Sequence, residues 1–165
     1  MIISISNAYS RWIQEFDWNI ALTLNFDSGV HREKAEEAAR HYWNQVDKAL
    51  FGKIAVRKRK IRLPRACFLE GEEGVRNWHF HCVVQMPKAE LLDVGSQVRC
   101  VSDTEFCEWL LEEWKKIDEA GKFSKAEPLQ FARRWVQYIS KCSFKEDESF
   151  CPTTSPLPIN DALRN

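Results

Sequence analysis

The sequence lacks the patterns that mark secreted, membrane-bound and zinc-finger proteins. It has six cysteines in 165 residues but no CxxC pair, so the spacing of a structural zinc site is absent. Residues 1–12 do not show the basic and then apolar layout of a signal peptide, and no apolar run approaches the length that spans a membrane. These absences predict a reduced, intracellular protein with no membrane partner.

An excess of charge of one sign is also missing. The 24 basic residues balance the 24 acidic ones, so the net charge gives no sign of a nucleic-acid partner. However, residues 53–65 are rich in Lys and Arg and contain no acidic residue. Within this basic segment, RKRKIR is the best candidate for contact with a DNA backbone, with a solvated basic loop as the alternative. The candidate DNA-binding residues are Arg57, Lys58, Arg59, Lys60 and Arg62.

Hydrophobic periodicity predicts an α+β fold. The expected elements are a strand at 18–26, a helix at 31–51 that ends at Gly52, a hairpin of strands at 65–70 and 78–86, a helix after a Ser102–Glu105 capping box, a strand near 122–128, and a helix at 129–142. Phe131, Trp135, Ile139 and Cys142 are expected on the inner side of the last helix. This order is typical of an antiparallel central sheet flanked by helices, of the ferredoxin-like kind. We expect one domain over residues 1–165, with a core at 18–142 and an irregular tail at 143–165.

Two histidines in the expected strand 78–86 give the first sign of chemistry. Residues two apart on a strand point to the same face, so His79 and His81 project together, away from the apolar alternate positions. Glu70 is expected to lie across the hairpin from them, with Glu72 and Glu73 in the turn as competing carboxylates. Two imidazoles and a carboxylate would bind a divalent cation and leave positions open for a phosphate oxygen. A pair of surface histidines is the alternative interpretation.

A tyrosine follows in the last expected helix, in RRWVQYISK. Tyr138 and Lys141 are three residues apart and so share a helix face. Tyrosine is a poor nucleophile while protonated, and a cationic neighbour favours the phenolate and offsets charge developing at phosphorus. Arg134, one turn earlier, is a candidate for a further phosphate contact. A surface tyrosine beside a solvated lysine is the alternative, and the other tyrosines, Tyr9 and Tyr42, have no comparable context.

Together these residues resemble the HUH endonucleases, especially the rolling-circle replication initiator (Rep) proteins of small circular replicons. ALTLNF at 21–26 is similar to the first motif of that family, HFH at 79–81 to its His-hydrophobic-His metal motif, and YISK at 138–141 to its Tyr-x-x-Lys motif. The motifs occur in the family's order over about residues 18–142. In viral Rep proteins a glutamate upstream of the histidines is also a ligand, and the similar stretch EGEEGVRNWH favours Glu70.

The resemblance implies a sequence-specific endonuclease that nicks and rejoins single-stranded DNA to initiate rolling-circle replication. Glu70, His79 and His81 would hold Mn²⁺ or Mg²⁺, Tyr138 would form a 5′-phosphotyrosine, and Lys141 would assist through its charge. The expected partners are single-stranded DNA or an origin hairpin. No GxxxxGK[ST] loop occurs, so a helicase would be a separate protein. The expected location is the cytoplasm of a bacterial host, or the host nucleus for a eukaryotic virus.

Two alternatives stay open. A relaxase or single-strand transposase of the same superfamily would use the same metal motif, although the single Tyr-x-x-Lys favours a replication initiator. A non-catalytic module that binds single-stranded nucleic acid would stack bases on exposed aromatic side chains. The expected outer face carries His79, His81 and Glu70 instead of an aromatic row, which favours catalysis.

Overall fold

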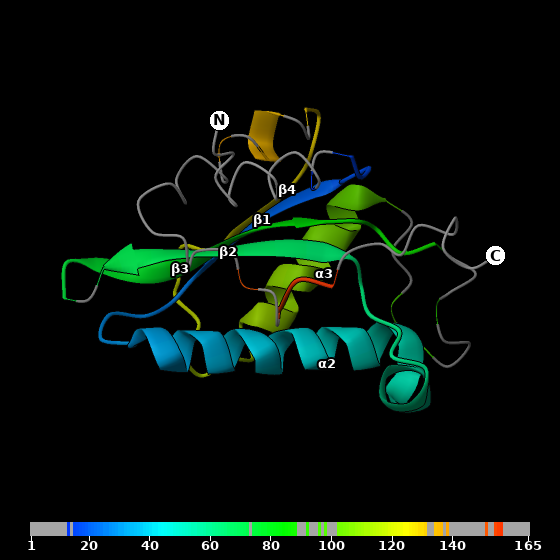
Figure 1. Cartoon of the computed structure of the whole chain (residues 1–165), viewed down its shortest axis with the longest axis horizontal. Helices are drawn as coiled ribbons and strands as arrows, with labels where there is room; N and C mark the ends of the chain where they lie inside the picture. Colours follow the sequence, from blue (N-terminus) through cyan, green and yellow to red (C-terminus); the bar gives the residue numbers. More distant parts are fainter. Residues whose placement is uncertain are drawn as a thin grey trace, which may run out of the picture.

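The computed structural model describes most of the chain between residues 13 and 156. The described residues are 13, 15–72, 74–88, 92, 96, 98, 102–131, 134–136, 138, 151 and 154–156. They form a four-stranded antiparallel sheet with two helices packed on one face (Figure 1). The predicted α+β class with an antiparallel sheet is therefore confirmed. None of the helices in these ranges is long and apolar enough to cross a membrane.

The elements follow the predicted order, with shifted boundaries. They are β1 (Ile20–Asn25), α2 (Arg32–Lys58), β2 (Arg65–Glu72), β3 (Arg76–Val84), α3 (Asp103–Trp114) and β4 (Lys125–Pro128). The strand order is β2-β3-β1-β4, and each neighbouring pair is antiparallel. Ser102 caps α3 as predicted, because its hydroxyl accepts a hydrogen bond from the backbone N–H of Glu105.

The helix that we expected to end at Gly52 continues beyond it. Gly52 has φ 79° and ψ 155°, which a glycine adopts without the steric cost of a side chain. The helix changes direction there, and a second helical segment runs to Lys58, seen end-on in Figure 1. The glycine therefore bends α2 without terminating it, and the first residues of the basic segment are helical.

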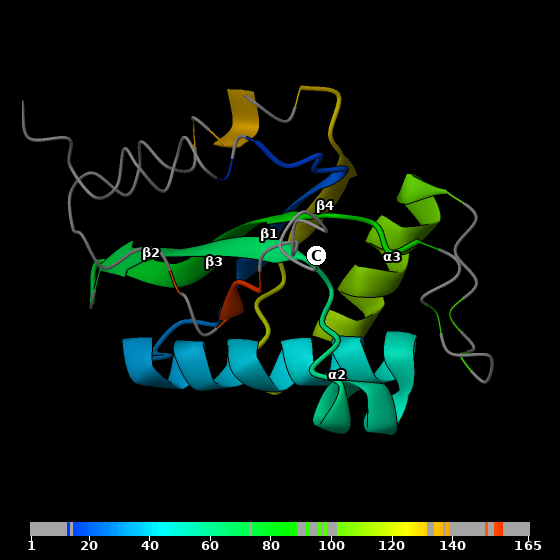
Figure 2. The same cartoon turned by 45° about the vertical axis from the view of Figure 1, so that its right-hand side comes forward.

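The two faces of the sheet are covered differently. The helix face carries the larger core, in which α2, α3 and the apolar alternate positions of β3 pack together as predicted. The buried β3 residues in it are Trp78, Phe80, Cys82 and Val84. The opposite face carries a smaller cluster formed by Ile13, Trp18, Ala66, Phe68, Val83 and Val136. Residues 134–136 lie over this second face in both views (Figures 1 and 2), and the cluster leaves the β2–β3 turn end of the face to polar side chains.

The prediction of which residues face inward from the last helix is partly wrong. Residues 134–136 and 138 are helical, but Phe131 precedes them in irregular chain, so the face of this helix does not include Phe131. Phe131 is 66% exposed, and fully buried Val136 points inward instead. Trp135 is half-buried against the smaller cluster, as expected of an inner position. Ile139 and Cys142 lie outside the described residues.

Part of the expected irregular tail lies along the outer edge of β2. The N–H of Cys151 donates to the carbonyl of Cys67 (3.0 Å), and the N–H of Cys67 donates to the hydroxyl of Ser155 (2.9 Å). The N–H of Arg65 donates to the carbonyl of Pro156 (2.9 Å). These bonds satisfy edge groups that would otherwise need water. The extent of the domain over residues 1–165 stays a prediction.

A buried ion pair joins α2 to β2 and to the tail. Asp47 and Arg65 are almost fully buried, with Nη1–Oδ1 and Nη2–Oδ2 distances of 3.0 and 3.2 Å. The N–H of Leu63 donates to Asp47 Oδ1, and Arg65 Nε donates to the carbonyl of Thr154. The guanidinium also lies 4.4 Å from the ring centre of Trp43. The two charges are paired and hydrogen-bonded, which is the condition for burying them.

Candidate metal centre

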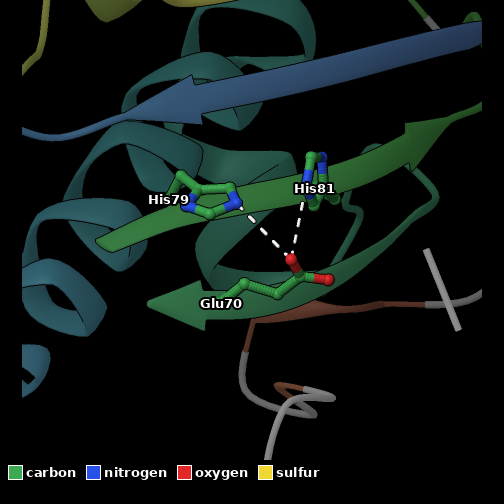
Figure 3. A group of neighbouring side chains, drawn as sticks. All are labelled: Glu70, His79 and His81. Atoms are coloured by element: carbon green, nitrogen blue, oxygen red, sulfur yellow. Dashed lines mark ion pairs between the residues drawn. The ribbon is translucent and has the colours of Figure 1, made fainter. Parts of the chain in front are cut away.

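Glu70, His79 and His81 converge on the face of the sheet opposite the helices. Glu70 and His79 are direct partners across β2 and β3, and His81 is the next residue of β3 on that face. Glu70 Oε2 lies 3.5 Å from His79 Nε2 and 3.7 Å from His81 Nε2 (Figure 3). One donor atom from each residue lies within 4.8 Å of the others. A cation about 2.1 Å from each donor would hold the donors roughly 3–4 Å apart, so the three residues fit a divalent cation after a small contraction.

Neighbouring backbone and side-chain groups orient both imidazoles. His79 Nδ1 lies 3.2 Å from the carbonyl oxygen of Asn77. A carbonyl only accepts, so this contact favours the proton on Nδ1, the tautomer in which Nε2 can bind a cation beside Glu70. His81 Nδ1 lies 3.2 Å from Oγ1 of Thr23, on the adjacent strand β1. Such outer contacts fix the ring orientation and the tautomer of metal-binding histidines.

The site also favours the neutral form of one imidazole. The pKa of His81 is lowered to about 4, mainly by burial; the Glu70 carboxylate opposes this shift, and the nearby His79 adds a smaller lowering. The imidazole of His81 is therefore neutral at pH 7, and neutral imidazole is the form that binds metal ions.

A β-bulge separates Glu70 from its competitor Glu72. The pairing of β2 with β3 shifts register between these two residues, and Glu72 is exposed and lies opposite Arg76. A Cβ atom on the intervening Gly71 would lie 2.6 Å from Cε3 of Trp78 and 2.8 Å from its Cα, so only glycine fits without a shift. The structure thus brings Glu70 to the histidines and directs Glu72 elsewhere, while Glu73 lies outside the described residues.

Tyr138 lies beside this group of ligands. Its ring centre is 6.3 Å from that of His81, and Trp135 packs against both rings, at 5.6 Å from Tyr138 and 6.1 Å from His81. Tyr138 is 54% exposed, so its phenol is accessible to a substrate. Tyr42 is fully buried, donates to the carbonyl of Leu110, and has a pKa raised well above the usual range by burial. Tyr42 is therefore not available as a nucleophile.

Of the two other residues expected near Tyr138, the structure describes Arg134 and not Lys141. Lys141 lies outside the described residues, and its assisting role stays a prediction. Arg134 is exposed and lines an open groove of about 540 Å³ together with Trp135, Tyr138 and residues 127–131. The predicted phosphate contact of Arg134 is therefore compatible with its place next to Tyr138.

The basic segment is not brought to the ligand group. It follows the bend of α2, on the helix side of the sheet and away from the β2–β3 turn (Figures 1 and 2). Arg62 has a structural role, since its guanidinium donates to the carbonyls of Val56 and Ile61 and lies 3.4 Å from Asp47. Arg57, Lys58, Arg59 and Lys60 are exposed, and their contact with DNA stays a prediction.

Two residues near the ligands had no functional role in the sequence interpretation. Thr23 was interpreted only as part of a strand motif. Alternation along the strand could have placed it near the ligands, because it puts Thr23 on the face away from the core. Trp135 was interpreted as a core residue, yet it also contacts His81 and Tyr138. No sequence signal distinguishes these two uses of a tryptophan.

Comparison with protein-family models, with curated proteins and with solved structures finds no match to this chain. The functional argument therefore depends on the geometry of the site.

Proposed function

We propose that this protein is a metal-dependent endonuclease that nicks and rejoins single-stranded DNA through Tyr138. The observation that carries the proposal is the packing of the Tyr138 ring beside His81, within the group formed by Glu70, His79 and His81. Three donors leave coordination positions for a phosphate oxygen, and the tyrosine is exposed beside them. Initiation of rolling-circle replication is the biological role that we assign to this chemistry.

The fold supports the same assignment. The strand-helix-strand-strand-helix-strand order and the strand order β2-β3-β1-β4 support a ferredoxin-like sheet. We propose that this sheet is of the HUH endonuclease type, with His79 and His81 on a central strand. The helix layer covers the opposite face, so a phosphate would approach the cation from the ligand face, beside Tyr138.

The residues around the site have separate roles in the proposed reaction. Bound at Glu70, His79 and His81, a divalent cation would polarise the scissile phosphate, and two imidazoles favour a transition metal such as Mn²⁺ over Mg²⁺. Tyr138 loses its phenolic proton to solvent, and its oxygen forms a bond to phosphorus as the bond from phosphorus to the 3′ oxygen breaks. The departing oxygen takes up a proton and becomes a 3′-hydroxyl. One phosphate ester bond replaces another, so the reverse attack can rejoin the strand.

The decisive experiment is a covalent-adduct assay. End-labelled single-stranded oligonucleotides with origin-like sequences are incubated with the protein and Mn²⁺ and run on a denaturing gel. We expect a protein-linked product that needs metal and disappears in Tyr138→Phe. Tyr42→Phe is the matched control and should keep the product, because Tyr42 is buried in the helix-side core.

Other outcomes would contradict parts of the proposal. Cleavage that survives in Tyr138→Phe would mean that another group is the nucleophile. Binding without cleavage across many sequences would favour a non-catalytic module for single-stranded nucleic acid.

A further inference from the structure

Phe131 is a large apolar side chain on the surface, beside the proposed nucleophile. It is 66% exposed, and it lines the open groove together with Arg134, Trp135 and Tyr138. The groove volume, about 540 Å³, is within the range of roughly 300–1,000 Å³ typical of small-molecule sites. One wall is formed by residues 127–131, where the chain leaves β4. The groove therefore includes the tyrosine that the proposed reaction uses.

The chain geometry places three of these side chains in a row. The N–H groups of Arg134 and Trp135 both donate to the carbonyl of Phe131, which starts the turn. Phe131, Arg134 and Tyr138 follow each other at intervals of three and four residues and are all exposed, while Val136 is buried. Arg134 and Tyr138 are four residues apart in the helical stretch and so share one side of it. Phe131 precedes the helix, and the turn places its ring 5.4 Å from the Arg134 guanidinium.

The groove carries a positive charge next to an aromatic ring. The Arg134 guanidinium lies 5.4 Å from the ring centre of Phe131, and it makes no ion pair within the part of the chain that the structure describes. The acidic residue of the groove, Glu127, is paired with Lys125. An aromatic ring and a nearby guanidinium together suit a nucleotide, since bases stack on aromatic rings and phosphates pair with arginine.

We propose that this groove binds one nucleotide of single-stranded DNA next to the phosphate that Tyr138 attacks. The base stacks on Phe131, and the phosphate of that nucleotide pairs with Arg134. This inference rests on the proposed function, because Tyr138 defines the position of the nucleotide. The groove would hold the strand against the sheet so that the scissile phosphate reaches the ligand group.

The test is a binding experiment that couples a protein change to a DNA change. Tyr138→Phe protein, which cannot form the adduct, is titrated with fluorescent single-stranded oligonucleotides in which each base in turn is replaced by an abasic site. One abasic position should weaken binding about tenfold or more. In the Phe131→Ala background that same position should have no further effect, and Phe131→Trp should restore the sensitivity. Arg134→Gln should lower the salt dependence of binding by about one unit of slope.

The controls separate this inference from the nuclease proposal. Ile54→Ala, a change of another exposed apolar residue on the helix side, should leave binding unaltered. Additive effects of Phe131→Ala and every abasic position would overturn the groove proposal even where the wild type nicks DNA. Coupling at one position, when the wild-type protein forms no adduct with the same oligonucleotides, would instead support nucleotide binding in the groove and refute the nuclease.

Discussion

A hydroxyl group on β1 supports one of the candidate metal ligands. Thr23 Oγ1 is 3.2 Å from His81 Nδ1, and the ring's other nitrogen faces Glu70. Binding of a cation through Nε2 requires the proton on Nδ1, from which the Thr23 hydroxyl oxygen can accept a hydrogen bond. Thr23 is therefore a positioning residue for His81.

Thr23→Val tests this support with little change in shape. We expect the affinity for Mn²⁺, measured by titration calorimetry, to fall about 10- to 100-fold, as for other outer contacts of metal ligands. Thr104→Val, on the exposed surface of α3, is the matched control and should bind Mn²⁺ like the wild type. Equal affinities for the two variants would show that Thr23 does not orient His81.

The choice between two glutamates is also testable at the residue scale. Glu70→Gln removes the carboxylate that faces both histidines, and we expect Mn²⁺ affinity to fall by more than the about 10- to 100-fold loss typical of a supporting residue. Glu72→Gln removes an exposed carboxylate two residues away and should leave the affinity intact. The reverse ranking in the same titration would move the ligand role to Glu72.

Sequence alternation was enough to find part of the site and not the rest. His79 and His81 could be placed on one face because a strand has a strict period of two. The approach of Glu70 depends on the bulge at Gly71, and the approach of Tyr138 depends on the packing of Trp135 and Val136. Neither follows from spacing along the chain, because each is a contact between elements.

At the scale of elements, the β2–β3 hairpin carries all three ligand residues and pairs two of them, Glu70 and His79, directly across the strands. Gly71→Ala would place a Cβ atom against Trp78, and we expect a loss of about 1–3 kcal/mol in the free energy of unfolding. Because the hairpin must shift beside Glu70, the affinity for Mn²⁺ should fall as well. Urea denaturation and metal titration measure the two effects.

Gly74→Ala is the control for Gly71→Ala. Gly74 has φ +72° in the turn, with no atom within 4 Å of an added Cβ, so the substitution strains the backbone without a collision. It should cost some stability and keep the metal affinity. Unaltered Mn²⁺ binding in Gly71→Ala would mean that the bulge does not position Glu70.

The elements themselves were predicted better than their ends. The periods of apolar residues predicted both helices and the strands β1 and β3, while β2 was inferred as the hairpin partner of β3, and β4 was expected near 122–128 without a clear period. The bend at Gly52 was mistaken for a helix end, because a glycine with positive φ occurs in both situations and only packing distinguishes them. Phe131 was assigned to a buried helix face because it is four residues from Trp135, but the helix begins only after Phe131.

At the scale of the whole molecule, the Asp47–Arg65 pair joins three parts of the chain. Asp47→Ala would leave the guanidinium buried without its partner, and we expect a loss of about 3–5 kcal/mol of stability in urea denaturation. The double change Asp47→Leu with Arg65→Met should cost less, because no charge is then left buried. A loss below about 1 kcal/mol in Asp47→Ala would show that the other hydrogen bonds of Arg65 are enough to stabilise its buried charge.

The position of the basic segment is a whole-molecule property that the sequence did not reveal. Its charges cluster along the chain, but the bend of α2 carries them to the helix side of the sheet. A strand bound at the ligand face would have to pass around the edge of the sheet to reach them. Contact with both regions therefore implies a bound segment longer than the few nucleotides that the ligand face covers.

The tail along β2 has a consequence for self-association. Without Cys151, Ser155 and Pro156, the outward N–H and C=O groups of Arg65 and Cys67 would be available to a strand from a second molecule. Exposed edges of this kind are sites where sheets join into aggregates. At the other margin, β4 is only 4 residues long and ends in Pro128, which cannot donate to a further strand. The tail thus covers one margin of the sheet, and the short, proline-ended β4 limits pairing at the other. We expect proteolytic loss of the tail to leave the β2 edge open to pairing with a second molecule.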